Sequence, residues 1–258
     1  MQEYVDLLNS VIWSPALIYL CLGAGLFFSF ITRFVQIRHF REMWRLLMSG
    51  KSSEQGISSF QALAVSLSGR VGTGNIAGVA AAIGFGGPGA VFWMWVVAFF
   101  GAATAYAEST LAQIYKEEDE GEFRGGPAYY IEKAMGQKWY AWVFAIATIF
   151  ACGVLLPGVQ SNSIGNAVEA AFGSGPMIDT AIGTFSFAKI LTGTVVSVIL
   201  AFIIFGGVKR IANFTQIVVP FMALAYIVTA FVIILLNIGE VPRIVGMIIG
   251  DAFTPMAG

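Results

Sequence analysis

Apolar residues occur along this chain in runs of about twenty, separated by shorter polar segments. A helix needs about 20 mostly apolar residues to cross the hydrocarbon core of a bilayer. Six ranges fit that length, namely 11–31, 58–84, 88–115, 139–171, 187–205 and 215–237. The pattern therefore predicts an all-α membrane protein that crosses the bilayer several times.

Basic residues predict how these spans are oriented. With six alternating spans and the N-terminus outside, the outer loops hold only Lys189 and Arg243, and nearly all other lysines and arginines fall in inner loops. Cytoplasmic loops of membrane proteins carry such an excess of basic residues. We therefore expect the N-terminus outside and the span 58–84 running from inside to outside.

The span 58–84 is interrupted near its middle by the segment GRVGTGN, residues 69–75. A helix in lipid must satisfy all its backbone N–H and C=O groups, so unwound backbone is tolerated only where it is buried in protein or lines a cavity. Secondary transporters build substrate and ion sites from such broken helices. Small residues spaced four apart, Gly74, Gly78 and Ala82, also suit helix packing, and both interpretations can hold together.

The two ends at this break differ in the ligand that they favour. The first half ends in free carbonyls that suit a dehydrated Na⁺, and the second half begins near Asn75 with free N–H groups that suit a carboxylate. We predict cation binding at Val71, Gly72 and Asn75, and substrate binding at Thr73, Gly74 and Asn75. An amino acid with a coupled cation is the expected occupant.

A second polar interruption lies within the span 139–171. Gly153, Pro157 and Gly158 loosen that helix, and the polar run QSNS, residues 160–163, follows. Gln160 is a candidate substrate-binding residue, because its amide can bond an amino or carboxylate group. Interhelical bonding is the alternative role, which we favour for Ser161 and Asn162.

Two charged residues inside spans are functional candidates, because charge is costly in lipid. Arg70 lies at the break and Glu108 lies in the next span. Glu108 is one candidate partner for Arg70, and hydration of Glu108 near the inner surface is the alternative.

Composition supports the membrane class and excludes other functions. The 258 residues are 57% hydrophobic and 11% charged, where soluble domains carry about 25% charged residues. A net charge of −1 indicates no nucleic-acid partner. Cys21, Cys152 and the single histidine, His39, form no transition-metal motif. Paired acids or a nucleophile with a base are also missing, so we expect neither an enzyme nor a cofactor.

Residues 31–47 predict an amphipathic helix on the inner membrane surface. Aromatic and aliphatic residues recur there at intervals of three and four, with arginines mostly between them. A connector with an apolar underside is the interpretation we prefer over a lipid sensor.

Several motifs resemble the alanine or glycine:cation symporters of bacteria and archaea. They are SFQAL (59–63), RVGTGNIAGVA (70–80), GGPGAVFWMW (86–95), RGGPAYY (124–130) and VQSNSI (159–164). The chain departs from the pattern at Gly69, where alanine is expected, and at Ala105, where lysine is expected. The resemblance implies sodium-coupled symport of alanine or glycine across the cell (inner) membrane.

The resemblance also implies a fold like that of the sodium-coupled leucine transporter, with an extra N-terminal helix and two inverted five-helix repeats. Residues 1–57 then hold the extra helix and the amphipathic helix, 58–238 the first repeat, and 239–258 an outer segment leading to a second repeat that is absent. We therefore expect an N-terminal half that does not transport alone. A half-transporter needing a partner and a non-transporting scaffold or channel-like subunit are the alternatives.

Overall fold

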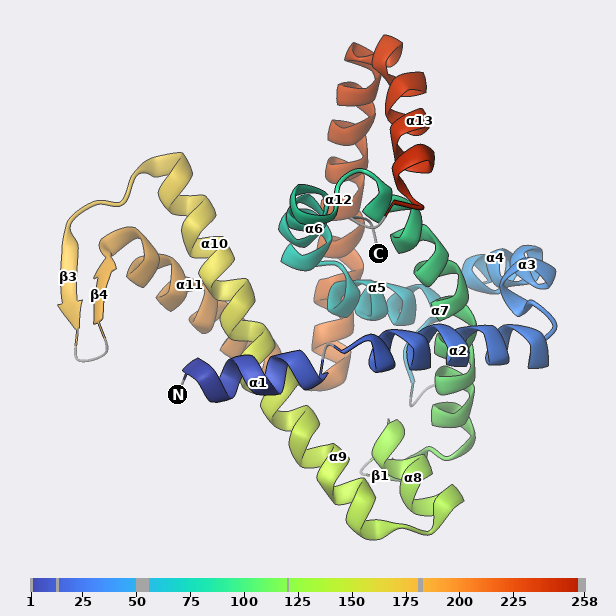
Figure 1. Cartoon of the computed structure of the whole chain (residues 1–258). Helices are drawn as coiled ribbons and strands as arrows, with labels where there is room; N and C mark the ends of the chain where they lie inside the picture. Colours follow the sequence, from blue (N-terminus) through green and yellow to red (C-terminus); the bar gives the residue numbers. More distant parts are fainter. Residues whose placement is uncertain (1, 13, 50–55, 120, 181–182, 255–258) are drawn as a thin grey trace. The chain divides into compact units, whose positions relative to one another are not determined.

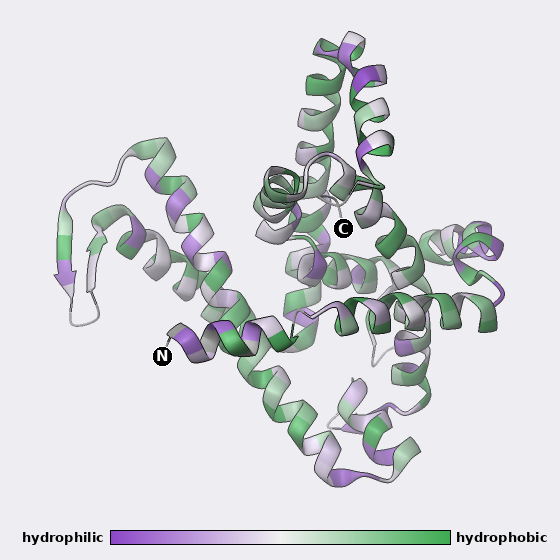
Figure 2. Ribbon diagram, viewed as in Figure 1, coloured by the Kyte–Doolittle hydropathy of each residue, from purple (hydrophilic) through white to green (hydrophobic). Residues whose placement is uncertain are grey.

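The computed structural model describes residues 2–12, 14–49, 56–119, 121–180 and 183–254, and these are almost entirely helical. Within them, the helices long and apolar enough to cross a membrane are Asn9–Ile31, Gly89–Ile114, Lys138–Phe172, Phe187–Ile204 and Gly207–Leu236. Figure 2 shows the hydrophobic colouring that these helices share. The predicted all-α membrane class is confirmed, with two short hairpins as additions.

The helices, labelled in Figure 1, form two compact units, which we describe separately. The first comprises Met1–Met48, Ala80–Gly136 and Asn237–Gly258, and the second comprises Ser49–Val79 and Gln137–Leu236. These units are groups of packed helices and do not test the predicted division into 1–57, 58–238 and 239–258. That division and the inverted-repeat fold stay predictions.

The first unit is built around the long helix α7. Its elements are α1 (Gln2–Ile12), α2 (Pro15–Ile31), α3 (Val35–Arg38), α4 (Phe40–Met48), most of α6 (Val79–Gly86), α7 (Gly89–Ile114), β1 (Glu117–Asp119), β2 (Glu122–Arg124), α8 (Pro127–Met135), the 3₁₀ turn η3 (Ile238–Glu240) and α13 (Val241–Asp251). Helix α2 packs against α7 where Gly25 is buried, and a Cβ there would lie 2.9 Å from the Cβ of Phe100. At the other end of α7, the Trp93 indole donates to the carbonyl of Ala252 at 2.6 Å. The two contacts attach α2 and α13 to one helix.

The predicted amphipathic helix over 31–47 is present, but its extent was wrong. It consists of α3 and α4, which meet at His39. Just before them, Arg33 and Phe34 have φ values of 52° and 53°. A left-handed backbone cannot continue a right-handed helix, so α2 ends and the chain turns. The Gln36 amide nitrogen then donates to the buried Ser29 hydroxyl at 3.2 Å, which holds α3 against α2.

The second unit pairs α5 with α12 and α10 with α11. Its elements are α5 (Ser59–Arg70), the π turn η1 (Gly74–Gly78), α9 (Lys138–Phe150), the π turn η2 (Ala151–Leu155), α10 (Leu156–Phe172), β3 (Met177–Thr180), β4 (Gly183–Ser186), α11 (Phe187–Ile204) and α12 (Gly207–Leu236). Ser58 and Gln61 form a capping box at the start of α5. The Gln61 amide nitrogen also donates to the Asn213 side chain at 2.9 Å, which links α5 to α12.

The predicted loosening near Pro157 appears as a π turn rather than a gap. Residues Lys138–Phe172 form one helical stretch in which η2 lies directly ahead of Pro157. Proline has no N–H to donate to the carbonyl four residues earlier, and a π turn absorbs such a defect within a helix. Gln160 follows one turn later, so the widened turn helps to set the direction of its side chain.

Candidate functional site

The span 58–84 is broken where the sequence predicted an interruption. Helix α5 ends at Arg70, Val71 is extended with φ −101° and ψ 111°, and η1 begins at Gly74. The interruption therefore covers Val71 and Gly72, and Thr73, with φ −57° and ψ −29°, already starts the second half. Since α5 and η1 both belong to the second unit, this break and the polar groups around it form one local site.

Carbonyl oxygens are available at the end of α5. The Leu67 carbonyl accepts the Val71 N–H at 2.8 Å. Among the described residues, no hydrogen bond ends on the carbonyls of Ser68, Gly69, Arg70 or Val71. These oxygens lie at the negative end of the α5 dipole. The predicted free carbonyls are confirmed, and they offer oxygen ligands to a cation.

Gln160 reaches the break from α10. Its side-chain oxygen accepts the Thr73 N–H at 3.2 Å and the Thr73 hydroxyl at 3.1 Å. A backbone N–H can only donate, so the oxygen of the amide must face Thr73. The amide nitrogen lies over Gly72, where a Cβ would come within 2.6 Å of it. Glycine at 72 therefore permits this approach, and two predicted substrate-binding residues, Thr73 and Gln160, lie together.

Asn75 closes the break from the other side. Its side-chain oxygen accepts the Gly72 N–H at 3.1 Å, and its own N–H donates to the Gly72 carbonyl at 3.0 Å. This arrangement is half of a capping box. The expectation that the second half begins with free N–H groups was wrong for Thr73 and Asn75, because nearby polar groups accept them. Gly74 has a backbone N–H with no acceptor among the described residues.

The two intramembrane charges lie in different units. The Arg70 guanidinium donates to the Ser66 hydroxyl one turn earlier on α5, at 3.0 Å. Glu108 lies on α7 in the first unit. The pairing of Arg70 with Glu108 stays a prediction, and Ser66 is a hydrogen-bond partner of Arg70 that was not predicted.

Comparison with known proteins identifies the family. The chain matches the model of the sodium:alanine symporter family over residues 1–258. The chain belongs to this family. The resemblance inferred from the sequence motifs is thereby confirmed, and the membrane-length helices agree with a multi-pass protein of amino-acid transport.

Three curated relatives show how similar this chain is to other members of the family. A Bacillus subtilis protein provisionally named a sodium/proton-dependent alanine carrier is 55% identical over 98% of this chain and 50% of its own length. A probable sodium/glutamine symporter of Bacillus subtilis is 42% identical over 98% of the chain and 51% of its own length. A sodium/alanine symporter of Methanococcus maripaludis is 41% identical over 98% of the chain and 55% of its own length. The chain thus spans about half the length of these relatives, and the expected second repeat stays a prediction.

Proposed function

We propose that this chain takes part in sodium-coupled symport of small neutral amino acids, alanine or glycine, across the cell membrane of a bacterium or archaeon. Its membership of the sodium:alanine symporter family supports symport. The observation that supports the location of the site is the contact between the Gln160 amide and Thr73 at the break in the helix.

The substrate carboxylate is proposed to take the place of the Gln160 oxygen. One carboxylate oxygen accepts the Thr73 N–H and hydroxyl, which bond the Gln160 amide oxygen within the protein. The Gly74 N–H lies next along the backbone, with nothing within 4 Å of the position that a Cβ would occupy there. Asn75 completes the proposed substrate site. Bonds from the Thr73 N–H and hydroxyl to an ionised carboxylate are stronger than their bonds to a neutral amide. This difference favours replacement of the Gln160 oxygen by the substrate carboxylate.

The cation is proposed to bind at the carbonyl end of the same break. The Val71 carbonyl has no donor among the described residues, whereas the Gly72 carbonyl accepts the Asn75 N–H. A carbonyl oxygen has two lone pairs. The Gly72 carbonyl oxygen and the Asn75 side-chain oxygen each accept one hydrogen bond, so each has a lone pair left for Na⁺. Unwound carbonyls coordinate Na⁺ in broken transporter helices, and transport follows when one helix bundle rocks against another around the fixed site.

Two further functions are distinguishable from this proposal. A scaffold or a channel-like subunit would show no saturable binding of amino acids that depends on sodium. A half-transporter would bind or transport only together with a partner chain, such as a second repeat. No observation on the described residues favours either alternative over symport.

The test is binding of radiolabelled alanine to the purified chain in sodium chloride and in choline chloride. We expect saturable binding that sodium strengthens and glycine competes away. If the chain alone does not bind, the assay is repeated after co-reconstitution with the second half of the 55%-identical relative. Sodium-independent or unsaturable binding in both preparations would overturn the proposal. Uptake into proteoliposomes by the chain alone is not expected.

A further inference from the structure

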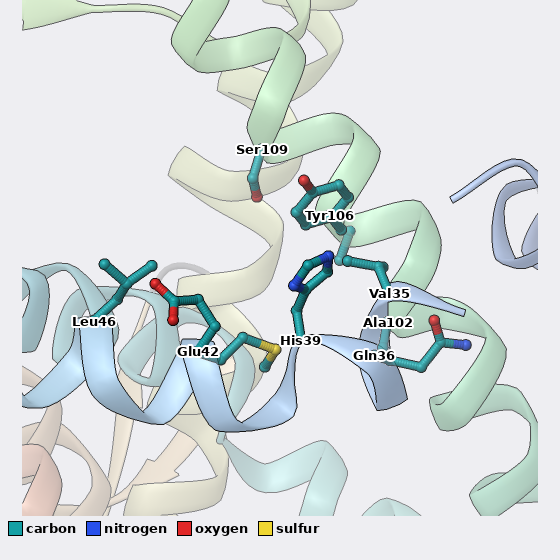
Figure 3. A pocket seen from close by; sticks show the side chains of 10 residues that line it. Val35, Gln36, His39, Glu42, Leu46, Ala102, Tyr106 and Ser109 are labelled. Atoms are coloured by element: carbon teal, nitrogen blue, oxygen red, sulfur yellow. The ribbon is translucent and has the colours of Figure 1, made fainter. Parts of the chain in front are cut away.

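A hollow of about 470 Å³ lies between α4 and α7 in the first unit (Figure 3). On the side of α3 and α4, its wall consists of Val35 and Gln36 of α3, His39 at the α3–α4 junction, and Glu42, Met43 and Leu46 of α4. The positions on α4 are spaced three and four apart and so share one helix face. Small-molecule pockets in proteins have volumes of about 300–1,000 Å³, so the hollow has the size of a ligand site.

Helix α7 supplies a stripe with the same spacing, formed by Ala102, Ala105, Tyr106 and Ser109. The two alanines leave the space between the helices open, since each side chain is a single methyl group. Most of the exposed wall is apolar, and Figure 3 shows the His39 ring extending from the α3–α4 junction toward α7. The polar lining groups are those of Gln36, His39, Glu42, Tyr106 and Ser109. The hollow therefore suits an apolar ligand that carries a polar end.

Several arginines are close in sequence to the residues that line this hollow. Its one lining carboxylate, Glu42, pairs with Arg45 on the same helix. The Arg38 guanidinium donates to the His39 ring at 3.1 Å and has no ion pair among the described residues. Arg33 and Arg41 are exposed and have no ion pair among the described residues. Among the described residues, the three arginines at 33, 38 and 41 therefore have no ion pair, and they fall within nine residues of sequence.

The outer faces of α4 match a bilayer surface. Phe40 and Trp44 are one turn apart and 65% and 59% exposed. Arg41 and Arg45 lie one turn apart on the adjoining face and are also exposed. A helix with an aromatic face beside a basic face lies in the membrane interface and is attracted to anionic lipids.

We propose that an anionic phospholipid binds at this site. One acyl chain enters the hollow between α4 and α7, and the phosphate is bound by Arg38 and Arg41, with Arg33 adding to the local field. A zwitterionic lipid would fill the hollow equally well but would leave the excess positive charge uncompensated. The charge therefore selects the anionic lipid, and the hollow accommodates its acyl chain.

Native mass spectrometry of the purified chain can test this site with phosphatidylglycerol and phosphatidylcholine of identical acyl chains. We expect phosphatidylglycerol to bind at least tenfold more tightly. A triple variant, R33Q with R38Q and R41Q, should lose about 100-fold, since each interfacial arginine contributes about fivefold. The matched control, K209Q with R210Q and R243Q, removes the same charge elsewhere and should lose less than threefold.

A second variant tests the hollow without changing charge. Ala102→Leu with Ala105→Leu fills the space, and we expect about tenfold weaker binding of long-chain phosphatidylglycerol with an unchanged circular dichroism spectrum. Equal binding of the two lipids, or equal losses in both triple variants, would overturn the proposal. Undiminished binding to the filled variant would also overturn it, because charge alone would then hold the lipid.

Discussion

The side-chain oxygen of Gln160 accepts hydrogen bonds from both polar groups of Thr73, a residue 87 positions earlier in the chain. The contact joins the break after α5 to the segment that follows the π turn of the helix over 138–172. An unsatisfied backbone group costs several kcal/mol in lipid, so this contact stabilises the break from within the protein. A substrate carboxylate must compete with it.

Gln160→Glu should block the proposed substrate site. A carboxylate attached to α10 would accept the Thr73 N–H and hydroxyl through charge-assisted bonds, which are about twice as strong as neutral ones. We expect sodium-dependent alanine binding to weaken at least tenfold, with no loss of thermal stability. The control is Asn166→Asp, the same charge change at an exposed position on α10, and it should bind alanine within twofold of wild type. If Gln160→Glu bound alanine with wild-type affinity, the substrate carboxylate would not take the place of the Gln160 oxygen.

Substitutions at Thr73 separate the hydroxyl from the backbone. Thr73→Val keeps the shape and the N–H but removes the hydroxyl donor, while Thr73→Ser keeps both donors. A hydrogen bond to a charged group is worth about 1.5–3 kcal/mol, so the valine variant should bind alanine about 10- to 150-fold more weakly. Equilibrium dialysis with labelled alanine measures this loss. Equal affinities of the serine and valine variants would remove the hydroxyl from the site.

Gly72→Ala should displace the Gln160 amide. The added Cβ would lie 2.6 Å from the amide nitrogen, and the side chain can move away only by giving up its bonds to Thr73. We expect the Thr73 amide to exchange with deuterium about fivefold to tenfold faster, as loss of a bond worth about 1 kcal/mol implies. The control is Gly69→Ala, where a Cβ meets nothing within 4 Å, and exchange at Thr73 should not change. Equal exchange in both variants would show that Gly72 does not control the contact.

The location of this site could be predicted from the sequence, but its internal bonds could not. Glycines and polar residues within an apolar span indicate a break, and the polar run at Gln160 indicates a second irregular segment. The pairing of Gln160 with Thr73 depends on the rotation of α10 about its axis, which packing with α11 constrains. The Asn75 cap had a local signal, the three-residue spacing from Gly72 that a capping box requires.

Two other parts of the fold differ in whether the sequence carries a signal for them. The segment 239–258, which we predict to lie outside, contains α13, and Pro242 in its first turn is a typical helix start that could have predicted this helix. The turn between α2 and α3 had no such signal, because Arg33 and Phe34, which have positive φ there, are not residues that favour the left-handed region. Tertiary contacts such as the bond from Gln36 to Ser29 accompany that conformation.

Glu169 and Lys189 should stabilise the pairing of α10 with α11. Their side chains are 28% and 33% exposed, with 3.0 Å between the Lys189 ammonium nitrogen and a Glu169 carboxylate oxygen. At this exposure the pair is worth about 1 kcal/mol. Glu169→Lys should lower the melting temperature of the purified chain, because it places two cations together. The exchanged pair, Glu169→Lys with Lys189→Glu, should recover most of the loss. Additive losses in the double variant would show that the two residues do not interact.

Gly89→Ala should detach α13 from α7. A Cβ at 89 would lie 2.5 Å from the carbonyl of Asp251 and 2.7 Å from the Ala252 nitrogen. Both are backbone atoms, so the clash cannot be relieved by rotating a side chain, and the bond from Trp93 to Ala252 would break as the helices separate. Overpacking of this kind costs about 1–3 kcal/mol. The control is Gly101→Ala on the same helix, where a Cβ meets nothing within 4 Å. We expect limited proteolysis to cut within residues 237–254 of the Gly89→Ala variant at least tenfold faster than in the control. Equal rates would mean that the close approach of α13 to Gly89 does not hold this helix in place.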